Sequence, residues 1–307
     1  MPFRLQHVQV YLLCQGGQAV LFDTGLDTPE NLLTLETALQ TIGKRVWDIV
    51  RVYITHSHVD HCGMAGRIKA ISGATIHMSE LSQPYTLRSE GEIRLVQEFS
   101  RRHGLPEDTT NYILSLFVKT REEIAGPFQI DRYLQPRETE SFGRWEFRAL
   151  STPGHTRDHL SFYFPREQLL LAGDHILPDI SPNLSPDVFA PDYRPLSSFL
   201  ASLDSIAELP LAKVYPAHGR PITDVKGRIR ELHDHHRVRK ELALESVRRG
   251  PKTTFQVAQD IFGTTLPEFD QFLALHETYV HLIELIGSGE IGETSSENPI
   301  LYDPLGD

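Results

Sequence analysis

The stretch Val52-Tyr-Ile-Thr-His56-Ser-His58-Val-Asp60-His61-Cys-Gly63 decides what the rest of the sequence can be. Four side chains that can bind a metal follow directly on an apolar run that is typical of a buried strand. Imidazole nitrogens together with a carboxylate oxygen suit zinc, iron or manganese better than calcium or magnesium. A strand fixes the backbone, and the loop after it lets alternate side chains converge. We therefore interpret the stretch as a metal site.

Three other segments place a candidate ligand directly after a strand pattern. His155 follows Thr152-Pro-Gly, Asp174 follows Leu170-Leu-Ala-Gly, and His218 follows Val214-Tyr-Pro-Ala. Each motif is weak alone, since a histidine after Pro-Gly is more often a turn residue than a ligand. Together, five histidines and two aspartates are enough for two ions that each keep an open position. The predicted metal ligands are His56, His58, Asp60, His61, His155, Asp174 and His218.

Several polar residues close to these motifs have two interpretations. Asp23, in the Asp-Thr-Gly turn after Ala19–Phe22, either serves only the turn or helps to fix the metal loop. His159 and His175 lie near predicted ligands, where a hydrogen bond to the site and a solvent-facing position are equally compatible with the sequence. Exposed positions on a charged helix are expected for His233, His235 and His236.

The bulk composition limits the classes of partner. The 307 residues carry a net charge of −11, which disfavours nucleic acid, because such binding depends on neutralising phosphates with basic side chains. The two cysteines, Cys14 and Cys62, give no disulfide framework and fit a reducing compartment. The N-terminus has no signal-peptide pattern, and no apolar run reaches the length of a membrane span. We expect a cytoplasmic protein with a small-molecule substrate and no membrane or nucleic-acid partner.

Strand and helix patterns alternate along the first part of the chain, which predicts an α/β domain over residues 1–222. A charged segment at about 80–140 reads as a helical insertion, and we expect it to cover the substrate. Outside it, the patterns predict a hairpin over 3–22, helices over 31–42, 64–72 and 196–209, and strands over 49–54, 74–78, 145–150, 160–164, 169–172 and 212–215.

Residues 223–307 form a predicted C-terminal unit. Helical patterns over 225–249, 255–262 and 268–286 precede a turn-rich stretch with room for a small hairpin, which resembles a winged-helix unit. Residues 233–307 hold thirteen acidic and six basic residues, a poor surface for phosphates. We expect the unit to serve in packing or in the formation of a homodimer.

Taken in order, the motifs closely resemble those of the metallo-β-lactamase superfamily. The resemblance covers about residues 3–222 and implies a four-layer αββα sandwich with the site at one edge between the two sheets. It also implies that His56, His58 and His155 hold one ion, that Asp60, His61 and His218 hold the second, and that Asp174 bridges them.

Departures from the family pattern narrow the subclass. Zinc β-lactamases carry a cysteine where this chain has Asp174, and flavodiiron oxygen reductases carry a glutamate in place of His58, so neither activity is expected. Asp174 instead resembles the bridging aspartate of glyoxalase II, acyl-homoserine lactonases and metal-dependent ribonucleases. The C-terminal unit looks like that of the lactamase-like protein 2 group.

These observations predict a dinuclear hydrolase with two divalent ions, zinc in first place and iron or manganese as alternatives. A metal-bridging hydroxide would attack a small thioester, ester or lactone, with Asp60 and Asp174 as the catalytic residues. The alternative is a phosphodiesterase or ribonuclease, which requires a basic cleft lined by Arg67, Arg88, Arg94, Arg101 and Arg102. An iron-loaded oxygenase or redox protein has weaker support, because no flavin or second redox motif is visible. A non-catalytic metal-binding module has the weakest support, because all seven ligand positions are present.

Overall fold

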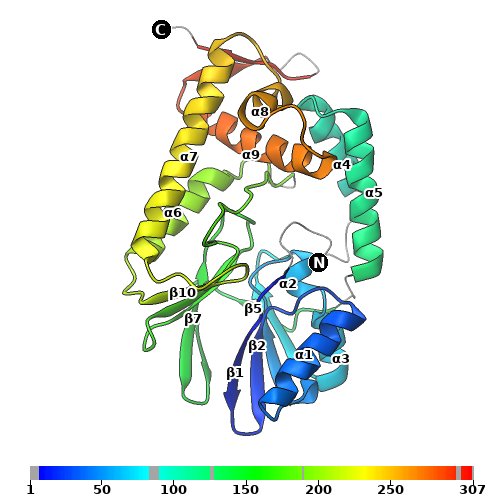
Figure 1. Ribbon diagram of the computed structural model, residues 1–307, viewed down its shortest axis with the longest axis vertical. Helices are drawn as coiled ribbons and strands as arrows, with labels where there is room; N and C mark the ends of the chain where they lie inside the picture. Colours follow the sequence, from blue (N-terminus) through cyan, green and yellow to red (C-terminus); the bar gives the residue numbers. More distant parts are fainter. Residues whose placement is uncertain (1–6, 83–89, 125–127, 189, 295–298, 306–307) are drawn as a thin grey trace. The chain divides into compact units, whose positions relative to one another are not determined.

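The computed structural model describes the chain except for residues 1–6, 83–89, 125–127, 189, 295–298 and 306–307 (Figure 1). It divides into two compact units, an α/β unit and a helical unit. The α/β unit consists of residues 1–87, 119–182 and 202–228, and the helical unit of 88–118, 183–201 and 229–307. Residues 88–118 and 183–201 thus group with the C-terminal part. The domain boundary after residue 222 stays a prediction.

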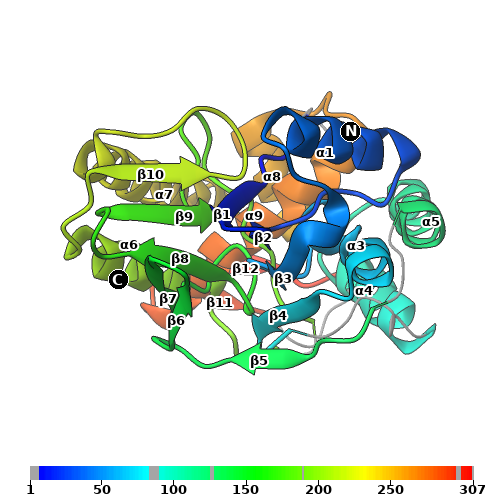
Figure 2. The ribbon, with the colours of Figure 1, turned by 90° about the horizontal axis from the view of Figure 1, so that it is seen from below.

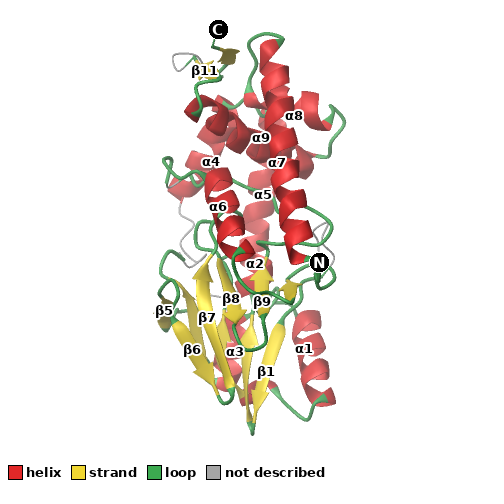
Figure 3. Ribbon diagram, turned by 90° about the vertical axis from the view of Figure 1, so that its left-hand side faces the viewer, coloured by secondary structure: helices red, strands yellow, loops and turns green. Residues whose placement is uncertain are grey.

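The α/β unit contains two five-stranded sheets among its described residues (Figure 3). In the first sheet only the β1–β2 pair is antiparallel, and in the second only the β9–β10 pair is parallel. The first sheet has the order β1 (Tyr11–Gln15), β2 (Gln18–Phe22), β3 (Ile49–Tyr53), β4 (Thr75–Ser79), β5 (Arg132–Leu134). The second has the order β10 (Lys213–Pro216), β9 (Leu169–Gly173), β8 (Leu160–Phe164), β7 (Trp145–Ser151), β6 (Thr139–Phe142).

Apolar side chains between the two sheets form the main core. Phe22 of the first sheet meets Phe147 and Phe162 of the second edge-on, with ring centroids 5.3 and 5.0 Å apart. Aromatic pairs prefer this edge-to-face geometry, which adds to the stabilisation from burial alone. Buried residues alternate with exposed ones along β6 and β7, as a strand with one face towards a core requires.

Helices cover the outer faces of both sheets. On the first sheet, Leu39 of α1 (Pro29–Thr41) and Ile68 of α3 (Ala65–Ser72) join a second apolar cluster with β3. On the other side, the C-terminal half of α6 (Pro195–Ala207) lies over the second sheet, and Leu203 on it is fully buried (Figure 2). The layers therefore form the αββα sandwich that the sequence predicts.

Local signals in the sequence explain where the first helices begin and end. Thr28 caps α1, because its hydroxyl accepts the Asn31 N–H at 3.2 Å, and Pro29 fits the first turn. Helix α3 ends at Gly73, whose φ of +72° is a conformation that glycine adopts at little cost. The short 3-10 turn η1 (Val46–Asp48) leads into β3, and the short helix α2 (Val59–Cys62) carries Asp60 and His61 of the predicted metal motif.

The helical unit consists of helices and a small two-stranded sheet. Its helices are α4 (Glu90–Arg102), α5 (Glu107–Ile124), the first half of α6, α7 (Val225–Arg248), α8 (Thr254–Phe262) and α9 (Glu268–Gly287), with α5 and α7 each extending into residues of the other unit. The antiparallel strands β11 (Ile291–Glu293) and β12 (Tyr302–Pro304) follow α9. Three helices and a hairpin are thus present in the predicted order.

Two expectations need correction. The predicted helical insertion ends earlier than residue 140, because β5 and β6 within it pair with the two sheets. The two strands are three and four residues long, too short to identify from the sequence. His236 is not exposed but buried, with its Nδ1 3.2 Å from Nε2 of His281. Leu232, Ala243 and Val247 are buried on the same helix, so His236 belongs to its apolar stripe.

Within the described residues, no helix combines the length and the apolar character that a bilayer crossing demands.

Candidate metal centre

Asp23 anchors the loop that carries the His-x-His-x-Asp-His motif. Its Oδ1 accepts the Thr55 N–H at 2.8 Å, and its Oδ2 accepts the Thr55 hydroxyl at 2.9 Å. The same Oδ2 accepts the Nδ1–H of His61 at 2.9 Å, so that Nε2 of His61 faces the site. Asp23 is buried and has φ +59°, a strained conformation for a residue other than glycine. Of the two interpretations of Asp23, fixing the metal loop is therefore the one the structure supports.

The other three predicted ligands come from the second sheet. His155 lies in the turn between β7 and β8, Asp174 follows β9, and His218 follows β10. Strands β9 and β10 are parallel, so their carboxyl ends lie at the same edge, and Ala217 N donates to Gly173 O at 2.8 Å. The structure thus brings all seven predicted residues together from four separate segments.

Three imidazoles form the first group of ligand atoms, His56, His58 and His155. Nδ1 of His58 lies 3.0 Å from Nε2 of His56 and 3.0 Å from Nε2 of His155. Two nitrogens bound at 2.0–2.1 Å to one tetrahedral zinc are about 3.3–3.4 Å apart, so this spacing suits a common ion. Nδ1 of His56 lies 3.0 Å from the Thr55 hydroxyl, which leaves its Nε2 for the metal.

Asp60, His61 and His218 form the second group. Oδ2 of Asp60 lies 3.8 Å from Nε2 of His61 and 3.6 Å from Nε2 of His218. The other nitrogen of His218, Nδ1, donates to the carbonyl oxygen of His7 at 2.6 Å. A ligand histidine is normally held by such a bond from its second nitrogen, which fixes both the tautomer and the ring orientation.

The carboxylate of Asp174 joins the two groups. Its Oδ2 lies 3.6 Å from Nε2 of His155 and 3.5 Å from Nε2 of His61. Its Oδ1 lies 3.4 Å from Nε2 of His218. One carboxylate therefore reaches ring nitrogens of both groups, which is the position that a bridging ligand takes.

Buried atoms without hydrogen bonds show that the residues fit divalent ions. Nε2 of His61, Nε2 of His218 and Oδ1 of Asp174 are buried, and none has a hydrogen-bond partner among the described residues. A buried polar atom without a partner is costly, so such a group points to an ion as the missing partner. Mixed imidazole and carboxylate donors suit zinc, iron or manganese.

The electrostatics of the candidate centre also favour a bound cation. Burial opposes a charge on His61, yet the carboxylates of Asp174, Asp60 and Asp23 raise its pKa well above the usual value. Burial likewise opposes ionisation of Asp174, but His61 and His218 hold its pKa well below the usual range. Burial, together with the neighbouring imidazoles of His61 and His58, lowers the pKa of His56 well below that of a free imidazole. Negative charge thus gathers around Asp174, where a cation is stabilised.

The sequence did not indicate two of the groups that support the site, and it left the roles of two histidines open. Thr55 links Asp23 to His56, and the carbonyl of His7 orients His218; the position of Thr55 directly before the first ligand was the only available signal. His159 and His175 are both fully buried rather than solvent-facing. His159 contacts the site directly, because its Nε2 accepts the N–H of Asp174 at 3.2 Å.

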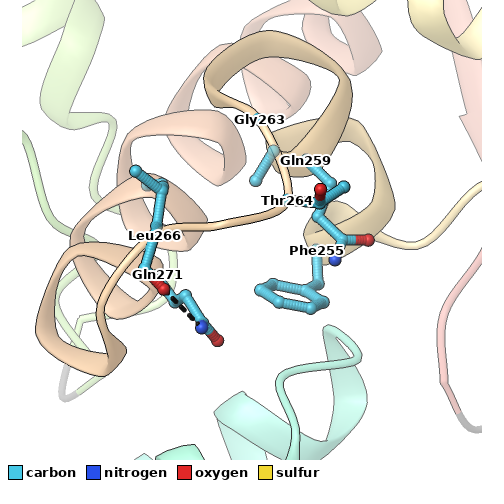
Figure 4. Close-up of a pocket in the computed structure, with 8 residues that line it drawn as sticks. Phe255, Gln259, Gly263, Thr264, Leu266 and Gln271 are labelled. Carbon is cyan, nitrogen blue, oxygen red and sulfur yellow. Dashed lines mark hydrogen bonds between the residues drawn. The ribbon is translucent and has the colours of Figure 1, made fainter.

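Cavities of the helical unit do not match this chemistry. The pocket between α8 and α9, lined by Phe255, Gln259 and Gln271, has a volume of about 10 Å³, room for a single water molecule (Figure 4). A groove of about 730 Å³ lies among α6, α7 and α9. Its lysine and one of its arginines are ion-paired, Lys240 with Glu290 and Arg237 with Asp234.

Comparison with known proteins agrees with the fold and the motifs. Residues 4–218 match the family model of the metallo-beta-lactamase superfamily. A protein named "Probable metallo-hydrolase YqjP" of Bacillus subtilis is 30% identical over 92% of this chain and 88% of its own. The "Atrochrysone carboxyl ACP thioesterase" of Aspergillus chevalieri is 25% identical over 87% of this chain and 71% of its own.

A solved structure covers nearly the whole chain. The "metallo-beta-lactamase family protein TTHA1429" of Thermus thermophilus superposes with a TM-score of 0.87 and 31% identity, over 99% of this chain and 96% of that one. The match includes the helical unit as well as the sandwich. The chain belongs to the metallo-β-lactamase superfamily and is a metal-dependent hydrolase of that family.

Proposed function

We propose that this protein is a dinuclear hydrolase of small thioesters, esters or lactones, that its two ions are zinc and that it acts in the cytoplasm. The observation that carries the proposal is the position of Asp174. Its carboxylate lies within 3.6 Å of ring nitrogens from both ligand groups, so the two groups can hold a pair of neighbouring ions.

The residues of the chain divide the catalytic work. A pair of divalent ions, when bound, polarises a carbonyl oxygen and lowers the pKa of water from its bulk value towards ~7, which supplies hydroxide at neutral pH. Asp60 is the more exposed carboxylate of the site, with 16% of its side chain accessible, against 8% for Asp174. Asp60 can therefore accept a hydrogen bond from the attacking water and orient it. Asp174 contacts both ligand groups and so keeps them next to each other.

In the proposed reaction the nucleophile is activated water, so no side chain has to attack the substrate. Cys62 is the cysteine next to the ligands, and it is buried in the apolar cluster of the first sheet. Burial raises the pKa of its thiol, which keeps it protonated and unreactive. Attack by activated water on a carbonyl carbon fits this arrangement, and the relative named as a thioesterase supports thioesters within the class.

The phosphodiester alternative has less support from the described arginines. Arg67 is paired with Asp27, and Arg101 is paired with Glu98. Such pairing cancels the charge that a phosphate needs. Arg88 lies outside the described residues. We propose a small molecule as the substrate, with no nucleic-acid or membrane partner.

The test is a substrate panel on metal-reconstituted protein. The metal-free protein is loaded separately with zinc, manganese and iron, and metal content is measured before activity. We expect about two ions per chain and turnover of thioesters or lactones. Faster hydrolysis of bis(p-nitrophenyl) phosphate than of every carbonyl substrate would move the assignment to the phosphodiester class. Uptake of only one ion would refute the dinuclear centre.

A further inference from the structure

His159 contacts three of the four segments that supply ligands, although it is not itself a ligand. Its Nε2 accepts the N–H of Asp174 at 3.2 Å. Its ring stacks on the ring of His56, with centroids 5.0 Å apart and an angle of 29° between the planes. Its carbonyl oxygen accepts the N–H of Thr152 at 2.9 Å and so closes the loop that carries His155.

The hydrogen bonds of His159 determine its tautomer. A backbone N–H can only donate, so Nε2 of His159 must be the unprotonated nitrogen. The proton of the neutral ring is therefore on Nδ1, which donates to the hydroxyl of Thr152 at 2.8 Å. That hydroxyl lies 2.9 Å from the hydroxyl of Ser161, which completes a buried polar chain. Burial lowers the pKa of His159 well below its usual value, in agreement with a neutral ring.

The backbone at the end of β9 lies close to one edge of the His159 ring. A Cβ atom added to Gly173 would lie 2.7 Å from Nε2 of His159 and 2.9 Å from Cβ of Thr55. The end of β9 therefore packs directly on the imidazole, one residue before Asp174. Only glycine permits this approach, and its φ of +52° also favours glycine.

We propose that His159 is a positioning residue for the metal centre: it holds the segments of His56, His155 and Asp174 at the separation that two ions require. The inference rests on the proposed dinuclear function. Unlike a histidine that merely fills space, His159 supplies an acceptor atom whose loss should weaken metal binding rather than only destabilise the fold.

The test compares zinc affinity in the full-length metal-free protein, by competition with a chromophoric chelator. His159→Leu removes the acceptor, and we expect zinc affinity to fall about 10- to 100-fold, the usual effect of losing a residue that orients ligands. His159→Gln can present a carbonyl oxygen to the same N–H, and we expect it to stay within about threefold of the wild type.

His77 supplies the matched control. It is also a buried histidine of the α/β unit, on β4, where its ring contacts Tyr53 and Nε2 lies 2.8 Å from the Thr75 hydroxyl. His77→Leu should lower the thermal stability of the metal-free protein but leave zinc affinity unchanged. If His159→Leu does not fold, Thr152→Val takes its place, because it removes the acceptor that orients the ring; we then expect zinc affinity to fall several-fold.

The outcomes separate the two proposals. Wild-type protein that binds no zinc, manganese or iron would refute the metal centre itself. Wild-type protein that binds zinc, with a His159→Leu or Thr152→Val variant that binds it equally well, would refute the role of His159 alone. A loss of zinc affinity in His77→Leu as large as in His159→Leu would also refute it, since the effect would then be general destabilisation.

Discussion

Replacement of Asp23 by asparagine tests how the fold prepares the metal loop. The asparagine keeps one oxygen, which can still accept the Thr55 N–H as Oδ1 does at 2.8 Å. Its NH2 group takes the place of Oδ2, which in the wild type accepts both the Thr55 hydroxyl and the Nδ1–H of His61 at 2.9 Å. An amide N–H donates, so His61 has to move its proton from Nδ1 to Nε2. Nε2 is then blocked as a ligand until the proton leaves.

The expected magnitude follows from that change of tautomer. Loss of a partner that orients a ligand histidine typically costs 10- to 100-fold in metal affinity, or about 1.4–2.8 kcal/mol. The effect should fall on the ion held by Asp60, His61 and His218, with the other ion much less affected. Titration of the metal-free protein with zinc against a chromophoric chelator resolves the two affinities.

Asp27→Asn is the control for this experiment. Asp27 also follows β2, but it pairs with Arg67 near the surface, where an ion pair contributes little. We expect its zinc affinities to stay within about twofold of the wild type. An Asp23→Asn protein that binds both ions as tightly as the wild type would refute this role of Asp23, and so would an Asp27→Asn protein whose affinity is weakened to the same extent.

Three further predictions follow from other parts of the molecule. Asp174→Ala should lose at least one ion per chain and abolish turnover, because no other carboxylate among the described residues reaches both ligand groups. Elemental analysis measures the ion content and the substrate panel measures turnover. Full activity with both ions retained would contradict the prediction. Tyr53→Phe removes a 2.6 Å hydrogen bond to the buried carboxylate of Glu140 and should lower the free energy of unfolding by about 1.5–3 kcal/mol, measured by urea denaturation near neutral pH; a loss below about 0.5 kcal/mol would contradict it. His103 is buried in the helical unit, and burial lowers its pKa to about 3, against ~6.5 in an unfolded chain. The unfolded state therefore binds a proton that the folded state does not, so this stability is present above about pH 6.5 and falls by up to about 1.4 kcal/mol per pH unit as the pH drops towards 3. His103→Asn should reduce the slope of the unfolding free energy against pH, between about pH 3 and 6.5, by the amount that corresponds to about one proton. An unchanged slope would contradict the low pKa of His103.

The convergence of the seven candidate ligands could be predicted because each of them follows a recognisable strand or turn pattern. His56, Asp174 and His218 each follow an apolar strand, and such runs are identifiable from residue type alone. The loops after parallel strands meet at one edge of a sheet, so order along the chain already indicates convergence. The same local signals predicted the hairpin of β1 and β2 and the helices α1 and α3.

Some features depend on contacts between residues far apart in the chain. The strands β5 and β6 are three and four residues long, and only their pairing with β4 and β7 identifies them. His236 looks like one of several histidines on a charged helix, and only packing against Phe199 and His281 shows that it faces inward.

The sequence alone indicated which side chains are candidate metal ligands, because metal-ligand chemistry is a property of residue type and of spacing along a strand and its loop. It did not determine how those ligands are held. Whether Asp23 serves a turn or orients His61 depends on a bond between residues 38 positions apart. Whether His159 faces solvent or supports Asp174 depends on the packing of β8 against β9. Tertiary structure decided both, since a hydrogen bond to the second nitrogen of a histidine forms only after separate segments have packed together.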